Sequence, residues 1–153
     1  MPVTGPLSHI DLSVGDPDVS IPFYTAFFEG LGFMRFPSDD PEFAGDAPRR
    51  AAWFIQYSNG PFFGVEVRPA APESRETRHD RYAPGLHHLA FHAASREVVD
   101  RVHERVVAVG GRVLDPPADY SGQEGYGNGY YAVFFADPDG VKLEAVFEPT
   151  TNP

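Results

Sequence analysis

The sequence repeats its own order of structural elements about halfway along the chain. Residues 7–14 alternate between apolar and polar side chains, which predicts a strand, and a helix around residues 23–31 follows. The second half repeats this with a strand at residues 86–93 and a helix at 95–109. The spacing from His9 to His88 equals that from Gly32 to Gly111, so two pairs of equivalent positions share one repeat length. Each half adds three more strands, predicted at residues 33–36, 51–57 and 62–68, and at 113–114, 130–136 and 141–147. We therefore predict an α+β fold of two tandem βαβββ modules.

A segment rich in proline and charged residues separates the two halves. We interpret residues 69–84 as a linker, with the first module at residues 6–68 and the second at residues 85–148. Residues 37–50 are expected to form a long polar loop. A chain of 153 residues can bury a substantial core, so a single domain over residues 1–153 is expected.

Composition excludes several classes of function. The chain has no cysteine, which rules out disulfides, thiolate metal ligands and a cysteine nucleophile. Its net charge of −10, from 12 basic and 22 acidic residues, argues against a nucleic-acid partner. It lacks both a signal-peptide pattern and the roughly 20 apolar residues of a membrane span. We expect no membrane partner and a cytoplasmic location.

Strand alternation places the polar residues of both halves on one face of each sheet. The opposite faces are apolar and suited to packing under a helix, and His87 shares such a face, which favours a structural role for it. A lone strand histidine or glutamate is more often a solvated or hydrogen-bonded residue than a ligand. Here His9 and His88 are equivalent in the two halves, and two imidazoles with one or two carboxylates suit a divalent metal. The residues on the polar faces are His9, His88, His92, Glu66 and Glu144.

A substrate pocket beside these residues would draw on nearby polar and aromatic side chains. Aromatic residues at such spacings belong more often to a core than to a cleft. Residues 119–129 are rich in glycine but lack the strand and helix that flank a phosphate-binding loop, so we predict a flexible lid over the site. The pocket candidates are Asp11, Trp53, His92, Tyr126 and Tyr130.

Four stretches carry a family resemblance: LSHIDLSV at residues 7–14, FYTAFFEGLGF at 23–33, GLHHLAF at 85–91 and FFADPDGVKLE at 134–144. They resemble the vicinal oxygen chelate superfamily, also called the glyoxalase, bleomycin-resistance and extradiol dioxygenase group, and the resemblance extends over nearly the whole chain. It implies a cup of curved mixed sheet around a divalent metal, such as nickel, zinc, iron or manganese. The family's ligand positions match His9, His88 and Glu144, and Glu144 is also expected to take part in catalysis.

A fourth ligand, found in glyoxalase I and related isomerases, has two possible positions here. Aligning Glu66 with Glu144 gives an offset one position shorter than the repeat. Aligning Pro69 with Pro149 gives an offset one position longer than the repeat and places Gly64 at the ligand position instead. Both lie on the same strand face, so alternation does not separate them. If Glu66 is the ligand, it would also be the base that transfers a proton.

The resemblance implies a metal-dependent small-molecule lyase or isomerase of the glyoxalase type, which stabilises an enolate-like intermediate on the metal. One alternative is an extradiol-type dioxygenase, although Phe134 stands where that group usually has a tyrosine. The other alternative is a bleomycin-resistance-like protein that binds a small ligand without catalysis. In this superfamily the cup forms within one chain or between two, and we expect a homodimer.

Overall fold

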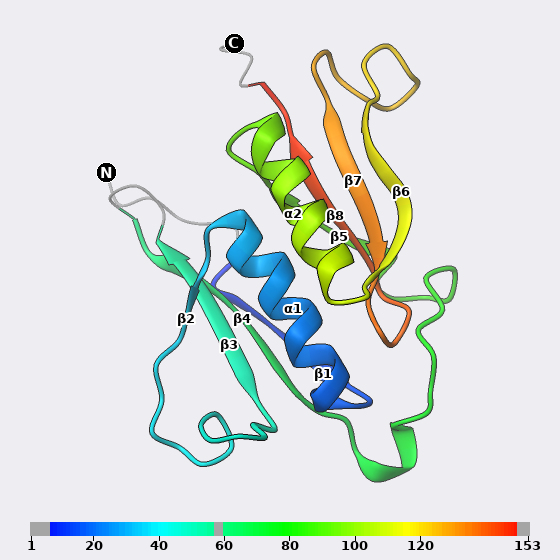
Figure 1. The fold of residues 1–153 in the computed structure, drawn as a ribbon. Coiled ribbons are helices and arrows are strands. Elements are labelled where there is room, and N and C mark those ends of the chain that lie inside the picture. The colour runs from blue at the N-terminus through cyan, green and yellow to red at the C-terminus, as the bar shows by residue number, and fades with distance from the viewer. Residues whose placement is uncertain (1–6, 57–59, 150–153) are drawn as a thin grey trace.

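The structure, a computed structural model, describes residues 7–56 and 60–149 (Figure 1). The first module contains β1 (His9–Val14), α1 (Pro17–Leu31), β2 (Met34–Arg35), β3 (Ala51–Gln56) and β4 (Phe62–Pro69). The second module contains β5 (His88–His92), α2 (Arg96–Ala108), β6 (Arg112–Asp119), β7 (Tyr131–Ala136) and β8 (Lys142–Phe147). The connecting segment contains a short 3-10 helix, Pro72–Ser74. The predicted α+β fold of two βαβββ modules is confirmed. No helix of the described residues is long and apolar enough to cross a membrane.

Local signals in the sequence set the helix ends. Asp16 accepts a hydrogen bond from the Asp18 amide at 3.0 Å and so caps α1. Gly32 ends α1 with a left-handed φ of 97°, a conformation that glycine adopts without strain. Ser95 caps α2 by accepting from the Val98 amide at 3.3 Å.

Each module forms its own four-stranded mixed sheet, in the orders β1-β4-β3-β2 and β5-β8-β7-β6. In both, the first and last strands of the module pair in parallel, and the remaining pairs are antiparallel. The strand predicted at residues 113–114 is much longer, because β6 continues through Pro116 and Pro117. An edge strand tolerates prolines and the register shifts that β6 shows against β7.

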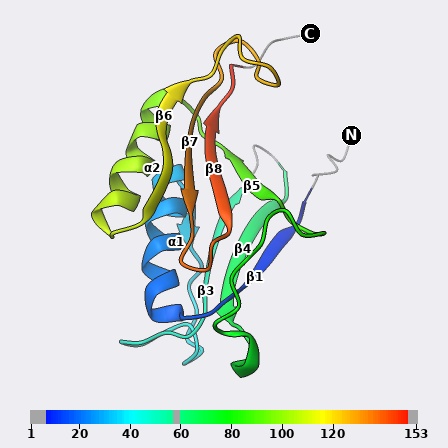
Figure 2. The ribbon, with the colours of Figure 1, turned by 90° about the vertical axis from the view of Figure 1, so that its right-hand side faces the viewer.

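One hydrophobic core joins the two modules. Helices α1 and α2 pack against each other between the modules (Figures 1 and 2). A side chain at Gly30 would lie 3.0 Å from Val102, so the glycine permits this close approach. The ring of Phe27 packs at 5.7 Å from Phe91 and 6.0 Å from Phe135, measured between ring centroids. The core faces of both sheets therefore turn toward the shared helices, and their polar faces turn outward.

A buried hydrogen bond connects the two modules. The Tyr24 hydroxyl on α1 donates to Asp137 Oδ2 in the β7–β8 turn at 2.6 Å. Asp137 Oδ1 accepts from the amides of Asp139 and Val141, which shapes the turn. Burial raises the pKa of both Tyr24 and Asp137, and the phenol stays protonated as a donor.

Removing this donor should weaken the contact between the modules. Tyr24→Phe leaves a buried carboxylate oxygen without its partner, so we expect a loss of about 1–3 kcal/mol in the free energy of unfolding, measured in urea. Tyr131→Phe is the matched control, because the Tyr131 hydroxyl donates at 2.7 Å to Asp100 in a less buried setting. A loss for Tyr24→Phe no larger than for Tyr131→Phe would contradict the importance of this contact.

Candidate active site

The outer face of the second sheet brings together His88 and Glu144. Glu144 lies on the central strand β8, and its side chain is only 3% exposed. Its Oε2 atom lies 3.4 Å from His88 Nε2 on the neighbouring strand β5. The Tyr130 hydroxyl donates a hydrogen bond to Glu144 Oε1. Burial and this hydrogen bond raise the pKa of Tyr130, which keeps the phenol a donor.

A small aromatic cluster covers this face beside Glu144. Tyr126 packs against Tyr120 and Tyr130, with ring centroids 5.2 and 4.8 Å apart, and Tyr120 packs on Phe134 at 5.7 Å. The glycine-rich segment for which we predict a lid has a hydrogen bond that joins its two ends. Ser121 Oγ accepts from the Gly129 amide at 2.7 Å.

The same segment is also fixed at its start. Hydrogen bonds from Ser121, and then from Arg96, lower the pKa of Asp119 to about 2. The Arg96 guanidinium reaches Asp119 at 2.6 Å from the first turn of α2. Tyr126 of this segment packs on Tyr130, the hydrogen-bond partner of Glu144.

The outer face of the first sheet carries the remaining candidates, His9, Asp11 and Glu66. They border a hollow of about 380 Å³, together with the aromatic residues Phe36, Phe54 and Phe62. His9 is exposed, and its Nδ1 atom lies 3.2 Å from the Ser8 hydroxyl. This face therefore combines an imidazole and two carboxylates with an apolar surface.

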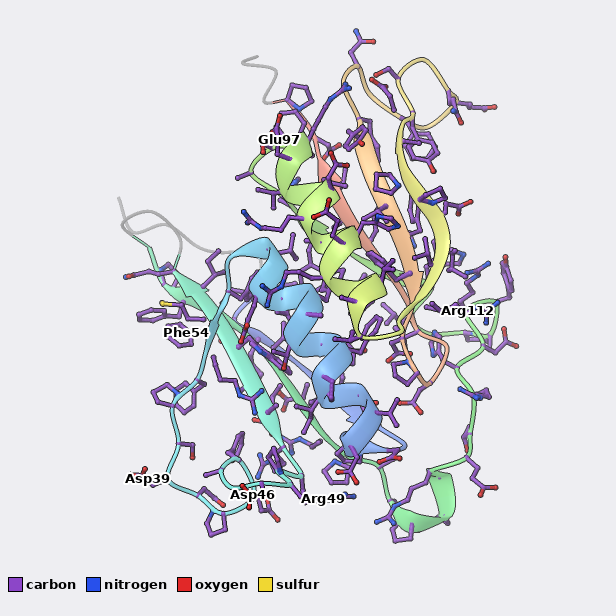
Figure 3. The ribbon with its side chains drawn as sticks, viewed as in Figure 1. Asp39, Asp46, Arg49, Phe54, Glu97 and Arg112 are labelled. Carbon is purple, nitrogen blue, oxygen red and sulfur yellow. The ribbon has the colours of Figure 1, made fainter. Side chains whose placement is uncertain are left out.

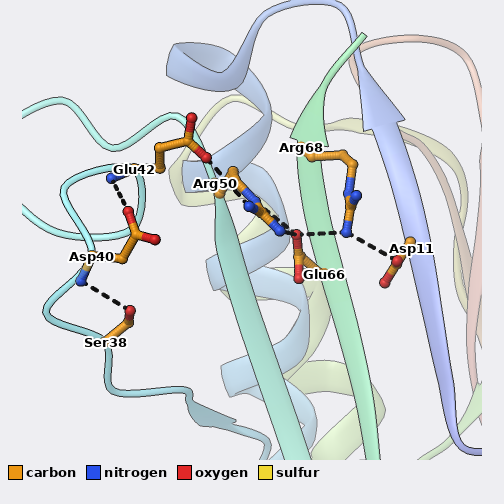
Figure 4. Close-up of polar contacts among 7 residues, drawn as sticks. All are labelled: Asp11, Ser38, Asp40, Glu42, Arg50, Glu66 and Arg68. Carbon is orange, nitrogen blue, oxygen red and sulfur yellow. Dashed lines mark hydrogen bonds and ion pairs between the residues drawn. The ribbon is translucent and has the colours of Figure 1, made fainter.

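Two arginines hold Glu66 in place (Figure 4). Arg50 donates through Nε to Glu66 Oε1 at 2.9 Å, and Arg68 lies 3.0 Å from the same oxygen. Arg68 also donates to Asp11 Oδ2 at 3.0 Å, and Arg50 pairs with Glu42 at 3.3 Å. The contacts to Glu66 all use Oε1, so the carboxylate is anchored through one oxygen.

Strand register identifies equivalent positions in the two modules. His9 pairs with Gly64 and Asp11 with Glu66 between β1 and β4. His88 pairs with Lys142, and Ala90 with Glu144, between β5 and β8. Glu66 is therefore the structural counterpart of Glu144, and Gly64 is the counterpart of Lys142. Of the two alignments that the sequence allows, the register supports the one that matches Glu66 with Glu144.

Other predicted residues lie apart from these groups. His92 shares the outer face but is 80% exposed on its side chain and lies 3.7 Å from Glu148. Trp53 is among the residues around the hollow, but its side chain is fully buried and packs on Phe28, so we assign it no direct contact with a ligand. The structural role expected for His87 in the core is wrong, because His87 precedes β5, is exposed and contacts His88.

The three predicted metal ligands fall into two separate groups. Within residues 7–56 and 60–149, no three His, Asp or Glu side chains are close enough together to hold one metal ion. His88 and Glu144 form a pair on the second sheet, whereas His9 lies on the first. Two imidazoles and a carboxylate match the donor preferences of zinc and of nickel, iron or manganese. Each sheet thus carries part of a chemically suitable ligand set.

Sequence reasoning missed the charged partners of these residues. Arg50 lies at the end of the loop at residues 37–50, which has no periodic pattern, and Arg68 lies on the same strand face as Glu66. Lys142, beside His88, lies with its ammonium group 4.4 Å from the centroid of the Phe134 ring. The alternation of β4 and β8 already placed Arg68 and Lys142 on the polar faces, so this signal was available.

Comparison with known proteins places these observations in one family. A sequence model of the Glyoxalase/Bleomycin resistance protein/Dioxygenase superfamily matches residues 7–145. The uncharacterized protein YqjT of Bacillus subtilis (strain 168) is 33% identical over 142 residues, covering 92% of this chain and 97% of YqjT. A crystal structure named as a candidate glyoxalase from Bacillus halodurans has a TM-score of 0.67 at 26% identity, covering 95% of this chain and 97% of that one. The fosfomycin resistance protein FosX of Listeria monocytogenes shares the fold, with a TM-score of 0.59, 20% identity and 97% of each chain covered. The chain belongs to the glyoxalase/bleomycin resistance protein/dioxygenase superfamily.

Proposed function

We propose that the protein is a metal-dependent lyase or isomerase that acts on a small molecule with two neighbouring oxygen atoms. His9, His88 and Glu144 would hold the divalent metal. When bound, such a metal supplies a Lewis acid that stabilises negative charge developing on substrate oxygens. The pairing of His88 with the buried Glu144 carries the proposal, because a carboxylate that is 3% exposed favours a cation as its partner.

The complete ligand set would form between two chains of a homodimer. The shared core and the bond from Tyr24 to Asp137 turn the polar faces of the two sheets outward. Bringing His9 to Glu144 within one chain would require this core to separate. Two copies related by two-fold symmetry can instead join the first module of one to the second module of the other, and would form two equivalent sites.

Glu66 is the residue best arranged to transfer a proton. It lies on the face that carries His9, and Arg50 and Arg68 orient its carboxylate through Oε1. This leaves Oε2 to accept a proton from a substrate held at the adjacent hollow. The resemblance to isomerases implies that the Glu66 carboxylate would also bind the metal.

Tyr130 acts on the site through Glu144. Its hydroxyl donates to Glu144 Oε1 and so fixes the rotamer that keeps Oε2 near His88. Hydrogen bonds of this kind orient ligating carboxylates in metal sites. We assign Tyr130 a positioning role, with Tyr126 packed on its ring.

The proposal is tested by metal content followed by a proton-exchange assay. Protein purified without chelators or a histidine tag should contain about one equivalent of nickel, zinc, iron or manganese per chain by elemental mass spectrometry. The metal-loaded protein is then incubated in D2O with hemithioacetals of 2-oxoaldehydes and with α-hydroxyketones. We expect metal-dependent deuterium incorporation or isomerisation, detected by proton NMR.

Different outcomes separate the alternatives. If the iron-loaded protein consumes oxygen with catechols and catalyses no proton exchange, the protein is a dioxygenase and not a lyase or isomerase. Failure to bind any of the four metals would favour the protein that binds a ligand without catalysis. The exposed aromatic side chains beside His9 give that second candidate its specific support, since they offer apolar surface without needing a metal.

A further inference from the structure

The hollow beside His9 has an aromatic wall, formed by Phe36, Phe54 and Phe62. The ring of Phe54 packs edge-on between the other two, with centroids 6.2 Å from Phe36 and 5.5 Å from Phe62. Phe36 and Phe62 are 52% and 55% exposed, although large aromatic residues usually bury most of their surface. Figure 3 shows Phe54 at the β2 side of the first sheet, well apart from α2. The three rings therefore present apolar surface on the same face as His9 and outside the shared core.

Gly64 forms part of the floor of this hollow, and nothing in the backbone requires a glycine there. The pairing of β4 with β1 and with β3 runs through Gly64 without a bulge. A Cβ atom at this position would meet only the Trp53 carbonyl oxygen, at an ordinary contact distance of 3.6 Å. Glycine weakens a strand interior and often marks a place where a ligand approaches closely. The missing side chain keeps the space between His9 and the aromatic wall open.

The hollow suits a small neutral group. Its volume of about 380 Å³ falls within the range of small-molecule sites, and a dry apolar cavity of about 150 Å³ already accommodates benzene. The carboxylates at its other end, Asp11 and Glu66, are paired with Arg68 and Arg50. The arginines hold these charges at that end, so the aromatic end of the hollow favours an uncharged group.

The two modules differ at this point. Lys142 stands in the second module where the first has Gly64, and its side chain lies over Phe134. Tyr120 and Tyr130 also pack over that sheet, around Phe134 and Val146. The part of the second sheet around Phe134 is thus filled by its own side chains, whereas the first sheet keeps a hollow.

We infer that this hollow is the subsite for an aromatic or similarly flat apolar arm of the substrate, with Phe54 and Gly64 setting the specificity. The inference rests on the proposed function in one respect, since the oxygen atoms of the same substrate would reach the metal held by His9, His88 and Glu144. It names the substrate class more narrowly, as a molecule with two neighbouring oxygens joined to an uncharged aryl group. The arm binds the first module of one protomer.

The first experiment compares two hydroxamates, which chelate a divalent metal through two neighbouring oxygens. Benzohydroxamate carries an aryl arm and acetohydroxamate only a methyl group. Calorimetry on the metal-loaded protein should give benzohydroxamate an affinity at least roughly tenfold higher, from the added apolar burial. Gly64→Leu fills the hollow, and Phe54→Ala removes the central ring. Each variant should bring the ratio of the benzohydroxamate affinity to the acetohydroxamate affinity close to one. Val107→Ala is the control, because it removes part of an apolar side chain that is 48% exposed on α2.

The second experiment needs no metal. Benzyl alcohol is titrated into the metal-free protein, and the amide signals of Ala52, Phe54 and Gly64 are followed by nitrogen–proton NMR. They should shift in the wild type and not in Gly64→Leu. If the wild type binds benzohydroxamate and acetohydroxamate with equal affinity, the aryl subsite is refuted but the metal site is not. If benzyl alcohol shifts these amide signals but the protein binds no metal, the subsite is supported and the proposed metal-dependent reaction is refuted.

A purely structural glycine would behave differently. Gly64→Ala and Gly64→Leu should keep or raise the Tm, because a side chain suits a strand better than glycine. A lowered Tm with the aryl preference intact would show that Gly64 serves the strand and would overturn its role in specificity.

Discussion

Replacing Glu144 with glutamine should remove metal binding almost completely. The substitution keeps the shape of the side chain and an oxygen that can accept the Tyr130 hydrogen bond, but it removes the only charge among the three proposed ligands. Changes to groups that merely orient ligands typically cost about 10–100-fold in metal affinity, so loss of the anionic ligand should exceed about 100-fold. Metal affinity is measured by competition with a chromophoric chelator, and retained metal by elemental mass spectrometry.

The matched control is Glu148→Gln on the same chain segment. Glu148 lies just beyond β8 and forms a distant pair with the exposed His92, so it should retain wild-type metal affinity. Both variants should keep the far-ultraviolet circular dichroism of the wild type. Glutamine also avoids the cavity that alanine would leave at a residue that is 2% exposed. Metal affinity of Glu144→Gln close to that of the wild type would refute the site.

The repeat and the alternation of the strands were sufficient to predict the fold. Apolar periodicity identified the two helices and the order of elements, since each helix covers the apolar face of its own sheet. Local propensity was misleading for β6, which runs through Pro116 and Pro117 because it lies at a sheet edge. Edge position depends on how the strands assemble, and strand propensity alone does not take it into account.

Alternation also predicted which face each site residue occupies, but not which faces meet. His9 and Glu144 were placed on polar faces, and the structure puts them on the outer faces of separate sheets. That separation follows from helix packing and from the contact of Tyr24 with Asp137, 113 residues apart in the chain. The pairing of Glu66 with Arg50 was equally hidden, because a loop side chain has no periodic pattern that fixes its direction. Contacts between distant segments depend on the assembled core.

Mixing two inactive variants should restore activity if the site forms between chains. His9→Ala removes a ligand from the first module, and Glu144→Ala removes one from the second. In a heterodimer of these two chains, one site carries both substitutions and the other carries neither. Because subunits that mix at random give about half heterodimers, roughly one quarter of all sites should be intact.

The restored fraction separates the two possible arrangements sharply. The variants are unfolded and refolded together at equal concentrations, and bound metal and turnover are compared with those of each variant refolded alone. About one quarter of wild-type activity requires His9 of one chain to act with His88 and Glu144 of the other. A site within one chain predicts no recovery at any mixing ratio, because every chain then carries a damaged ligand set. Co-refolding of His88→Ala with Glu144→Ala is the control: both lie on the second module, so neither arrangement yields an intact site and no activity should return.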